Sequence, residues 1–181
     1  MKIENERRYI LARPPLSGAH IGLSITQLYM IDGSRLREST ELWPQPGIVS
    51  HERIFKESTG FGVATETDVD GATREEVDGA IQVRPGLHKV RLVYYSDGGL
   101  LKWEVDVFSD PVRMVMMEVE VPEYSGLTIE TVDSRMPAFL RRLVLRDVTG
   151  LKEFSNASLA HTEGNLRPRI ALRPEWLRRP E

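Results

Sequence analysis

The sequence predicts an α+β protein that is mainly β, a closed eight-stranded antiparallel β-barrel with helices packed outside. Three observations predict this fold. Segments rich in β-branched and aromatic residues recur along the 181 residues, separated by turn residues. Within these segments like charges stand two residues apart, and apolar residues occupy the positions between them. About eight such segments can be distinguished, the number that a small closed barrel needs.

Proline, glycine and Asp-Gly turns separate the expected strands. The strands are residues 2–11, 20–30, 35–43, 49–58, 61–69, 88–95, 100–108 and 113–122. Pro14 and Pro15 end the first strand, because proline cannot donate to a ladder. Asp32-Gly33 predicts a hairpin between the second and third strands. Pro44 breaks the third strand, and Gly60 or Gly62 marks the turn between the fourth and fifth.

An expected helix at 72–81 follows the fifth strand, because the residues from Thr73 to Glu76 have the pattern of a helix start. Pro85-Gly86 ends this connection. The three strands that follow form a meander, with turns at 96–99 and at Pro111.

After residue 123 the pattern becomes helical. The spacing of apolar residues between Ser134 and Leu145 predicts a core-facing helix with interleaved arginines. Residues 155–160 are expected to form a final short helix. Residues 167–181, rich in Pro and Arg, are expected to be a C-terminal strap or tail.

The composition limits the kinds of partner and site that we expect for this protein. Residues 1–181 are expected to form one domain, as a monomer or a homodimer. A net charge of -3 argues against nucleic acid as a partner. The chain lacks Cys, which excludes thiolate metal sites and cysteine nucleophiles. The N-terminal residues resemble no signal peptide and no apolar stretch is long enough for a membrane span, so we expect a cytoplasmic protein with no membrane association.

The paired charges predict the chemistry. The acidic pairs are Glu4/Glu6, Glu104/Asp106 and Glu118/Glu120, and the basic pairs are Arg35/Arg37 and Lys89/Arg91. Each pair projects from one face of its strand, since strand side chains alternate. The solvated face of an ordinary sheet is the alternative, but such a face need not sort its charges by sign. If the charged face points into a barrel, acidic strands can hold a divalent cation and basic strands a polyanion, which together make a site for a metal-bound phosphate chain.

An ordered series of motifs resembles one family. Residues 3–11 (IENERRYIL) resemble the N-terminal ExExK signature of the CYTH superfamily, or triphosphate tunnel metalloenzymes, with Arg8 at the position of its Lys. Further similarities follow in the same order at residues 27–30, 34–37, 55–56, 88–91, 103–108, 118–120 and 155–160. The resemblance implies an eight-stranded tunnel that binds Mg²⁺ or Mn²⁺ and a triphosphate.

The residues and the resemblance together give each candidate a role. The expected ligands of phosphate are Arg8, Tyr29, Arg35, Arg37, Lys56, Lys89 and Arg91. The expected metal ligands are Glu4, Glu6, Glu66, Glu104, Asp106, Glu118 and Glu120. Lys56, Glu66 and Asp106 are the candidate catalytic residues. Two alternatives stay open: Glu104 and Asp106 as structural salt-bridge partners, and Tyr29 as a wall residue.

The resemblance implies a triphosphate-containing small molecule as substrate. Metal-dependent hydrolysis of inorganic tripolyphosphate or a small organic triphosphate is the first expectation. A class IV adenylate cyclase is the second, and a non-catalytic polyphosphate or nucleotide binding module is the third. The binding module has support in residues 64–68, where the acidic motif of the family pattern is shortened and the basic residue of that pattern is absent.

Overall fold

The computed structural model describes residues 2–15, 17–60, 63–69, 71–123 and 125–161, with the side chains of 2–4 and 58–60 left out. The strands are β1 (Lys2–Leu11), β2 (Ile21–Tyr29), β3 (Ser34–Trp43), β4 (Val49–Gly60), β5 (Val63–Val69), β6 (Gly86–Ser96), β7 (Leu101–Asp110), β8 (Met114–Glu120) and β9 (Val144–Asp147). The helices are α1 (Arg74–Ala80), α2 (Ala138–Arg141) and α3 (Asn156–Ala160). The predicted tail at 167–181 lies outside the described residues.

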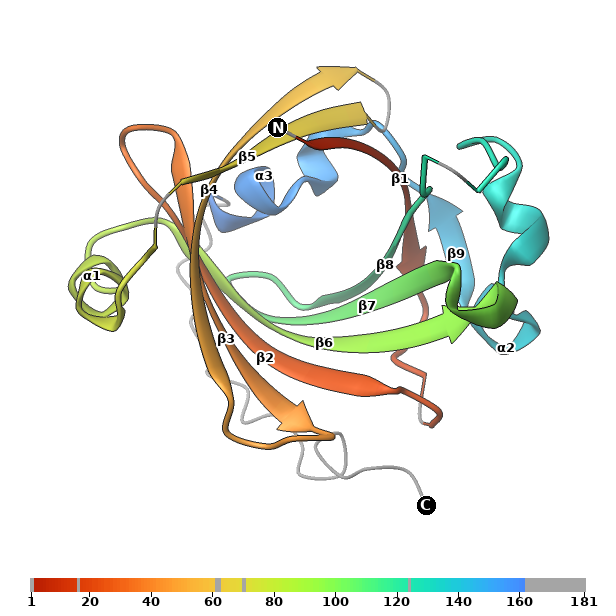
Figure 1. Ribbon diagram of the computed structural model, residues 1–181, viewed down its shortest axis with the longest axis horizontal. Helices are drawn as coiled ribbons and strands as arrows, with labels where there is room; N and C mark the ends of the chain where they lie inside the picture. Colours follow the sequence, from red (N-terminus) through yellow and green to blue (C-terminus); the bar gives the residue numbers. More distant parts are fainter. Residues whose placement is uncertain (1, 16, 61–62, 70, 124, 162–181) are drawn as a thin grey trace.

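Eight of these strands form a closed antiparallel ring (Figure 1). Hydrogen-bonded neighbours follow the order β5-β4-β3-β2-β6-β7-β8-β1, and β1 pairs again with β5. The first half of β1 pairs with β5, with Ile3 opposite Thr65, and the second half pairs with β8, with Glu6 opposite Glu120. The predicted closed eight-stranded barrel is confirmed.

The largest described hydrophobic core lies outside the ring. Outward residues of β7 such as Trp103 and Val105 are fully buried in it. Val132, Met136 and Leu140 cover them from the segment that follows β8. Because one face of these strands packs against this covering segment, the alternate residues of β7 and β8 face the interior of the barrel. The apolar packing therefore holds the wall in place from outside and leaves the inner face to polar residues.

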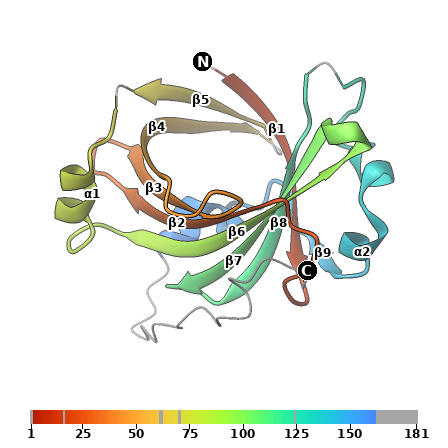
Figure 2. The same cartoon turned by 60° about the horizontal axis from the view of Figure 1, so that its bottom comes forward.

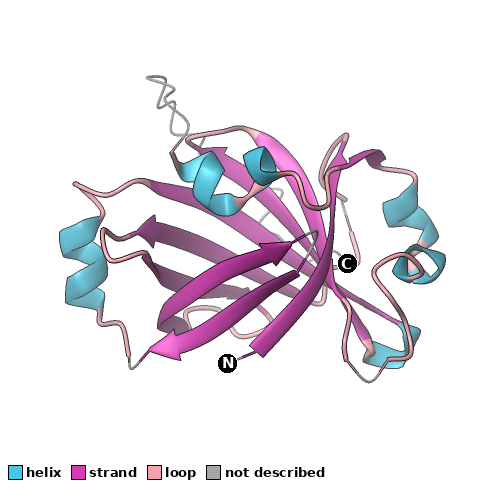
Figure 3. Cartoon of the chain, turned by 90° about the horizontal axis from the view of Figure 1, so that it is seen from above, coloured by secondary structure: helices cyan, strands magenta, loops and turns pink. Residues whose placement is uncertain are grey.

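The helix expected at 72–81 is present as α1 and starts as predicted. Thr73 accepts a hydrogen bond from the backbone N–H of Glu76, and the Glu76 side chain accepts one from the backbone N–H of Thr73. Val77 and Ala80 pack against the outer faces of β2 and β3. Figures 2 and 3 show α1 and α2 on opposite sides of the strands.

The prediction of a helix at 134–145 is wrong. The chain instead makes a 3₁₀ turn at Val132–Arg135, the four-residue α2, and β9. Met136 is extended, because the residue before a proline disfavours the helical conformation. Residues from Val144 onward pair with the end of β1, so backbone pairing there replaces the helical periodicity.

One end of the barrel interior is apolar and is covered by α3. Leu159 and Ala160 of α3 pack against Leu87, Phe108 and Met116, which come from β6, β7 and β8. In Figure 1, α3 lies within the outline of the ring. The polar interior therefore begins where this apolar cluster ends. No described helix is long and apolar enough to cross a membrane.

Candidate functional site

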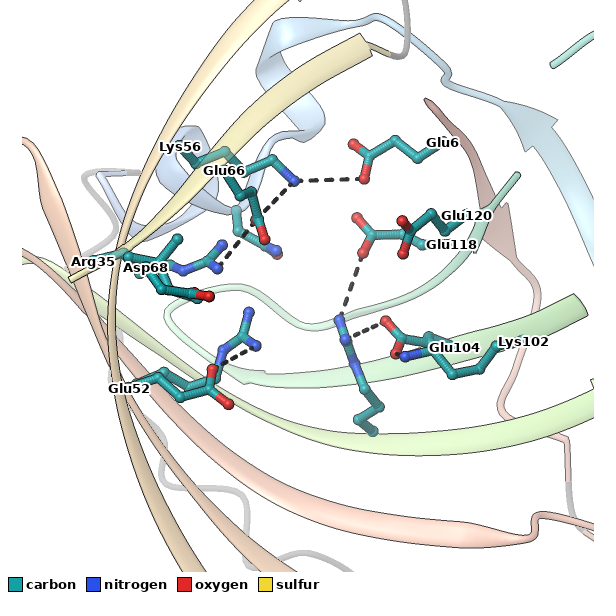
Figure 4. A pocket seen from close by; sticks show the side chains of 14 residues that line it. Glu6, Arg35, Glu52, Lys56, Glu66, Asp68, Lys102, Glu104, Glu118 and Glu120 are labelled. Atoms are coloured by element: carbon teal, nitrogen blue, oxygen red, sulfur yellow. Dashed lines mark hydrogen bonds and ion pairs between the residues drawn. The ribbon is translucent and has the colours of Figure 1, made fainter. Parts of the chain in front are cut away.

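A charged cavity of about 490 Å³ occupies the barrel interior (Figure 4). Its described lining consists of Glu6, Arg35, Arg37, Glu52, Ile54, Lys56, Glu66, Asp68, Arg91, Lys102, Glu104, Glu118, Glu120 and Asn156. Seven of these side chains are carboxylates and five are cations. Ile54 is the single apolar residue in this described lining.

The cations of one wall come from β3 and β4. Arg35 and Lys56 both contact Glu66, with N···O distances of 3.3 and 3.4 Å. Arg37 contacts Glu52 at 3.3 Å. Burial lowers the pKa of Arg37, and the positive charges of its neighbouring arginines lower it further. These three cations form the basic wall of the cavity.

The basic wall retains unused donors. The Nε atoms of Arg35 and Arg37 are buried and have no hydrogen-bond partner among the described residues. A buried unsatisfied donor costs about 1–3 kcal/mol, and a charged one costs more. A bound anion would satisfy both donors and offset the repulsion between the two guanidinium groups.

The opposite wall is acidic and comes from β1 and β8. Glu6 and Glu120 are direct partners across these two strands, and both line the cavity. Like charges in this arrangement destabilise a sheet. Figure 4 shows Glu6, Glu118 and Glu120 facing Arg35, Lys56 and Glu66. Lys56 spans the cavity, with its Nζ atom 3.6 Å from Glu6 Oε2.

Arg8 joins the carboxylates of the acidic wall. Its Nη2 lies 2.5 Å from Glu6, its Nε lies 2.7 Å from Glu118, and its Nη1 donates to the carbonyl of Phe154 at 3.2 Å. Burial raises the pKa of Glu118, but Arg8 and the other nearby cations outweigh burial and hold this pKa well below its usual value. Arg8 is absent from the described lining, so it contacts the site through Glu6 and Glu118.

Lys89 and Asp106 point into the barrel but lie beneath the cavity, next to Phe108 of the interior apolar cluster. Both side chains are fully buried, and Lys89 Nζ lies 2.5 Å from Asp106 Oδ2. Asp106 also accepts from Nε and Nη2 of Arg91, each at 2.7 Å. The expected direct contact of Lys89 and Asp106 with a ligand has no support in this placement. The structure instead supports the salt-bridge alternative for Asp106, which fixes the direction of Arg91.

The remaining expected residues differ in their placement. Glu104 lines the cavity and pairs with Arg91 and with Lys102, the latter at 2.7 Å. Tyr29 is partly buried beside the apolar end of the interior and accepts a hydrogen bond from Gln27. The side chain of Glu4 lies outside what the structure describes.

Sequence reasoning missed four polar residues that line the cavity: Glu52, Asp68, Lys102 and Asn156. Strand alternation was a usable signal for three of them. Asp68 and Lys102 each stand two residues from a predicted site residue, and Glu52 stands four residues from Lys56. Asn156 carried no such signal, because its position at the cavity depends on where α3 docks.

The acidic wall has donors of the kind that Mg²⁺ and Mn²⁺ prefer. Glu6, Glu118 and Glu120 offer carboxylate oxygens to the cavity. Among the residues that the structure describes, no three Asp, Glu or His side chains are grouped to hold a metal ion. Arg8 instead neutralises Glu6 and Glu118. The donor set fits a divalent cation chemically, and such an ion would compete with Arg8 for the same oxygens.

Comparison with solved structures identifies the fold. The chain is similar to "the hypothetical protein NE1496" (TM-score 0.51, 23% identity, 87% of this chain and 97% of that chain). It is also similar to "the inorganic triphosphatase NE1496" (0.50, 22%, 88% and 95%) and to the PH1819 protein from Pyrococcus horikoshii OT3 (0.51, 12%, 80% and 92%).

Comparison with family models and with curated proteins finds no match. The structural matches confirm the fold that the resemblance to the CYTH superfamily implies, a closed antiparallel barrel shared with an inorganic triphosphatase.

Proposed function

We propose that this protein is a divalent-metal-dependent triphosphatase acting on inorganic tripolyphosphate or a small organic triphosphate. One observation carries the proposal: a basic wall with unused donors faces an acidic wall across a single cavity. The similarity in fold to a structure described as an inorganic triphosphatase supports it.

The side chains have distinct tasks in this proposal. Arg35, Arg37 and Lys56 bind phosphate oxygens from the basic wall, with each charge-assisted contact contributing about 1.5–3 kcal/mol. Arg91 of β6, held in place by Asp106, adds a further cation to the cavity. These contacts orient the phosphate chain along the cavity and stabilise the charge that develops during transfer.

In this proposal the acidic wall would bind the metal. Glu6, Glu118 and Glu120 would hold Mg²⁺ or Mn²⁺, with Glu4 and Glu66 as further candidates. The ion would neutralise negative charge on the phosphate oxygens. Glu66 is well placed to hold Arg35 and Lys56 in the direction of the phosphate, since it contacts both.

The lining favours hydrolysis over the cyclase reaction. A cyclase must hold an adenine base as well as a triphosphate, and bases are bound through apolar or aromatic contacts. The described lining includes Ile54 but no aromatic side chain. This composition suits a ligand that is phosphate throughout.

Binding without turnover is the second candidate, because of one feature of β5. Ala64, Glu66 and Asp68 share its inward face, so the described part of this strand supplies acids and no base to the cavity. The basic wall is therefore smaller than the family pattern implies. Such a wall can retain affinity for phosphate while lacking a group that the reaction needs.

The test is release of phosphate, pyrophosphate and cyclic AMP from tripolyphosphate and ATP, with Mg²⁺, with Mn²⁺ and with EDTA. We expect metal-dependent phosphate release that Glu6→Gln abolishes and Glu57→Gln, an exposed change on the outer face of β4, leaves intact. Cyclic AMP with pyrophosphate would identify a cyclase. Metal-dependent binding without any product would identify a binding module.

A further inference from the structure

Asn156 is the one lining residue that comes from a helix in the described part of the cavity. It is the first residue of α3, and its Oδ1 atom is buried without a hydrogen-bond partner among the described residues. It is also the one neutral polar side chain in the described lining. An unsatisfied buried acceptor costs free energy, so its presence at a cavity indicates that a hydrogen-bond donor inside the cavity completes it.

The position of Asn156 is fixed from two directions. Ser155 caps α3 by accepting a hydrogen bond from the backbone N–H of Ser158 at 3.1 Å. Leu159 and Ala160 anchor the helix in the apolar cluster that covers one end of the barrel interior. The preceding segment is tied to the acidic wall, because the Phe154 carbonyl accepts from Arg8. Asn156 is therefore preorganised at the covered end of the cavity.

The missing partner must be a hydrogen-bond donor. No described cationic side chain of the cavity donates a hydrogen bond to Asn156 Oδ1. Fully ionised phosphate oxygens only accept hydrogen bonds, so they cannot satisfy this atom either. A water molecule can donate to Oδ1 and still direct a lone pair elsewhere. A side-chain amide that orients an attacking water is an established device in phosphoryl transfer.

We propose that Asn156 positions the attacking water and that the terminal phosphate of the substrate lies at the α3 end of the cavity. This assignment rests on the proposed hydrolytic function. The water oxygen forms a bond to the terminal phosphorus as the bond from that phosphorus to the bridging oxygen breaks. Pyrophosphate leaves with the bond electrons, and a water proton passes to the phosphate products. Asn156 is a positioning residue throughout and exchanges no proton.

The experiment compares Asn156→Ala and Asn156→Asp with the control Ala157→Ser, an exposed change on the same helix. Asn156→Ala should lower kcat for tripolyphosphate about 10- to 100-fold through loss of orientation, with KM changed less than about twofold. Asn156→Asp keeps an acceptor oxygen, so it should retain more of kcat than Asn156→Ala. Its added negative charge should raise KM. Ala157→Ser should match the wild type.

Each other outcome has a distinct meaning. Full activity of Asn156→Ala, or a raised KM with unchanged kcat, would overturn the positioning role while leaving the triphosphatase intact. An Asn156→Asp variant as slow as Asn156→Ala, with unchanged KM, would also contradict it. A wild-type protein that binds tripolyphosphate without hydrolysis would remove the proposed function and this assignment together. Thermal unfolding of every variant, with and without tripolyphosphate and Mg²⁺, checks that each one is folded and still binds the ligand.

Discussion

Glu6 of β1 and Glu120 of β8 lie directly opposite each other, and both side chains line the cavity. Two carboxylates in this position repel, which weakens the contact between neighbouring strands. The structure places this repulsion among the candidate ligand-binding residues. We interpret the pair as half of a cation site whose full stability appears only with the cation bound.

Glu120→Gln removes one charge of this pair. We expect the free energy of unfolding in EDTA to change by less than about 1 kcal/mol, because the variant also removes like-charge repulsion. Metal-dependent kcat should fall about 100-fold, because the variant would weaken binding of the metal that stabilises charge on the transferring phosphate. Thermal unfolding and phosphate release measure the two effects. Equal activity of Glu120→Gln and the outer-face control Glu57→Gln would remove Glu120 from the site.

Arg37→Met tests the basic wall. Loss of one charge-assisted contact should raise KM for tripolyphosphate about 10- to 100-fold. Because burial and nearby arginines already disfavour the charge of Arg37, stability without ligand should be unchanged or higher. Arg53→Met is the matched control, since Arg53 pairs with Glu76 on the outer face of β4. Similar KM values for the two variants would contradict the assignment.

Arg8→Lys tests competition between Arg8 and the metal. Lysine has one ammonium group and cannot reproduce the fork that reaches Glu6 and Glu118 together. We therefore expect Mn²⁺ to bind about threefold to tenfold more tightly to the variant, as measured by calorimetric titration. Arg7→Lys, on the opposite face of β1, should leave Mn²⁺ affinity unchanged. Weaker Mn²⁺ binding to Arg8→Lys would show that Arg8 supports the metal site.

The sequence predicted the barrel well because local signals and register agree along most strands. Asp32-Gly33 marks a real hairpin, and the capping box of Thr73 and Glu76 marks a real helix. The prediction failed between Ser134 and Leu145, where pairing with β1 decides the conformation. Such long-range pairing leaves no periodic signal in the segment itself.

In the candidate site too, local patterns predicted some residues, and residues placed by tertiary packing were missed. Alternation correctly assigned Arg35, Arg37 and Glu118 to the inner face, because that pattern is local. It could not show that Lys89 is buried beneath the cavity, since depth depends on how tightly neighbouring side chains pack around the residue. Nor could it place Asn156, whose contact with the cavity is made by docking of α3.

Lys89 makes stability depend on pH. Burial lowers its pKa to about 8 from the usual 10.5, although Asp106 opposes this shift. Between pH 8 and 10.5 the unfolded chain holds a proton that the folded chain has lost. The contribution of Lys89 to the free energy of unfolding should therefore rise with pH across this window. Urea unfolding of the wild type and Lys89→Met measures it as their difference, which should grow in favour of the wild type. A difference that shrinks over the same range would contradict the account.

The most direct test of the central claim is calorimetric titration of tripolyphosphate into the wild-type protein, with EDTA and with Mg²⁺. Seven carboxylates outnumber five cations in the described lining, so the cavity alone should repel a polyanion. We expect no measurable binding in EDTA and strong binding with Mg²⁺. Tight binding in EDTA that Mg²⁺ leaves unchanged would show that the acidic wall holds no metal for the phosphate chain, and would contradict the account.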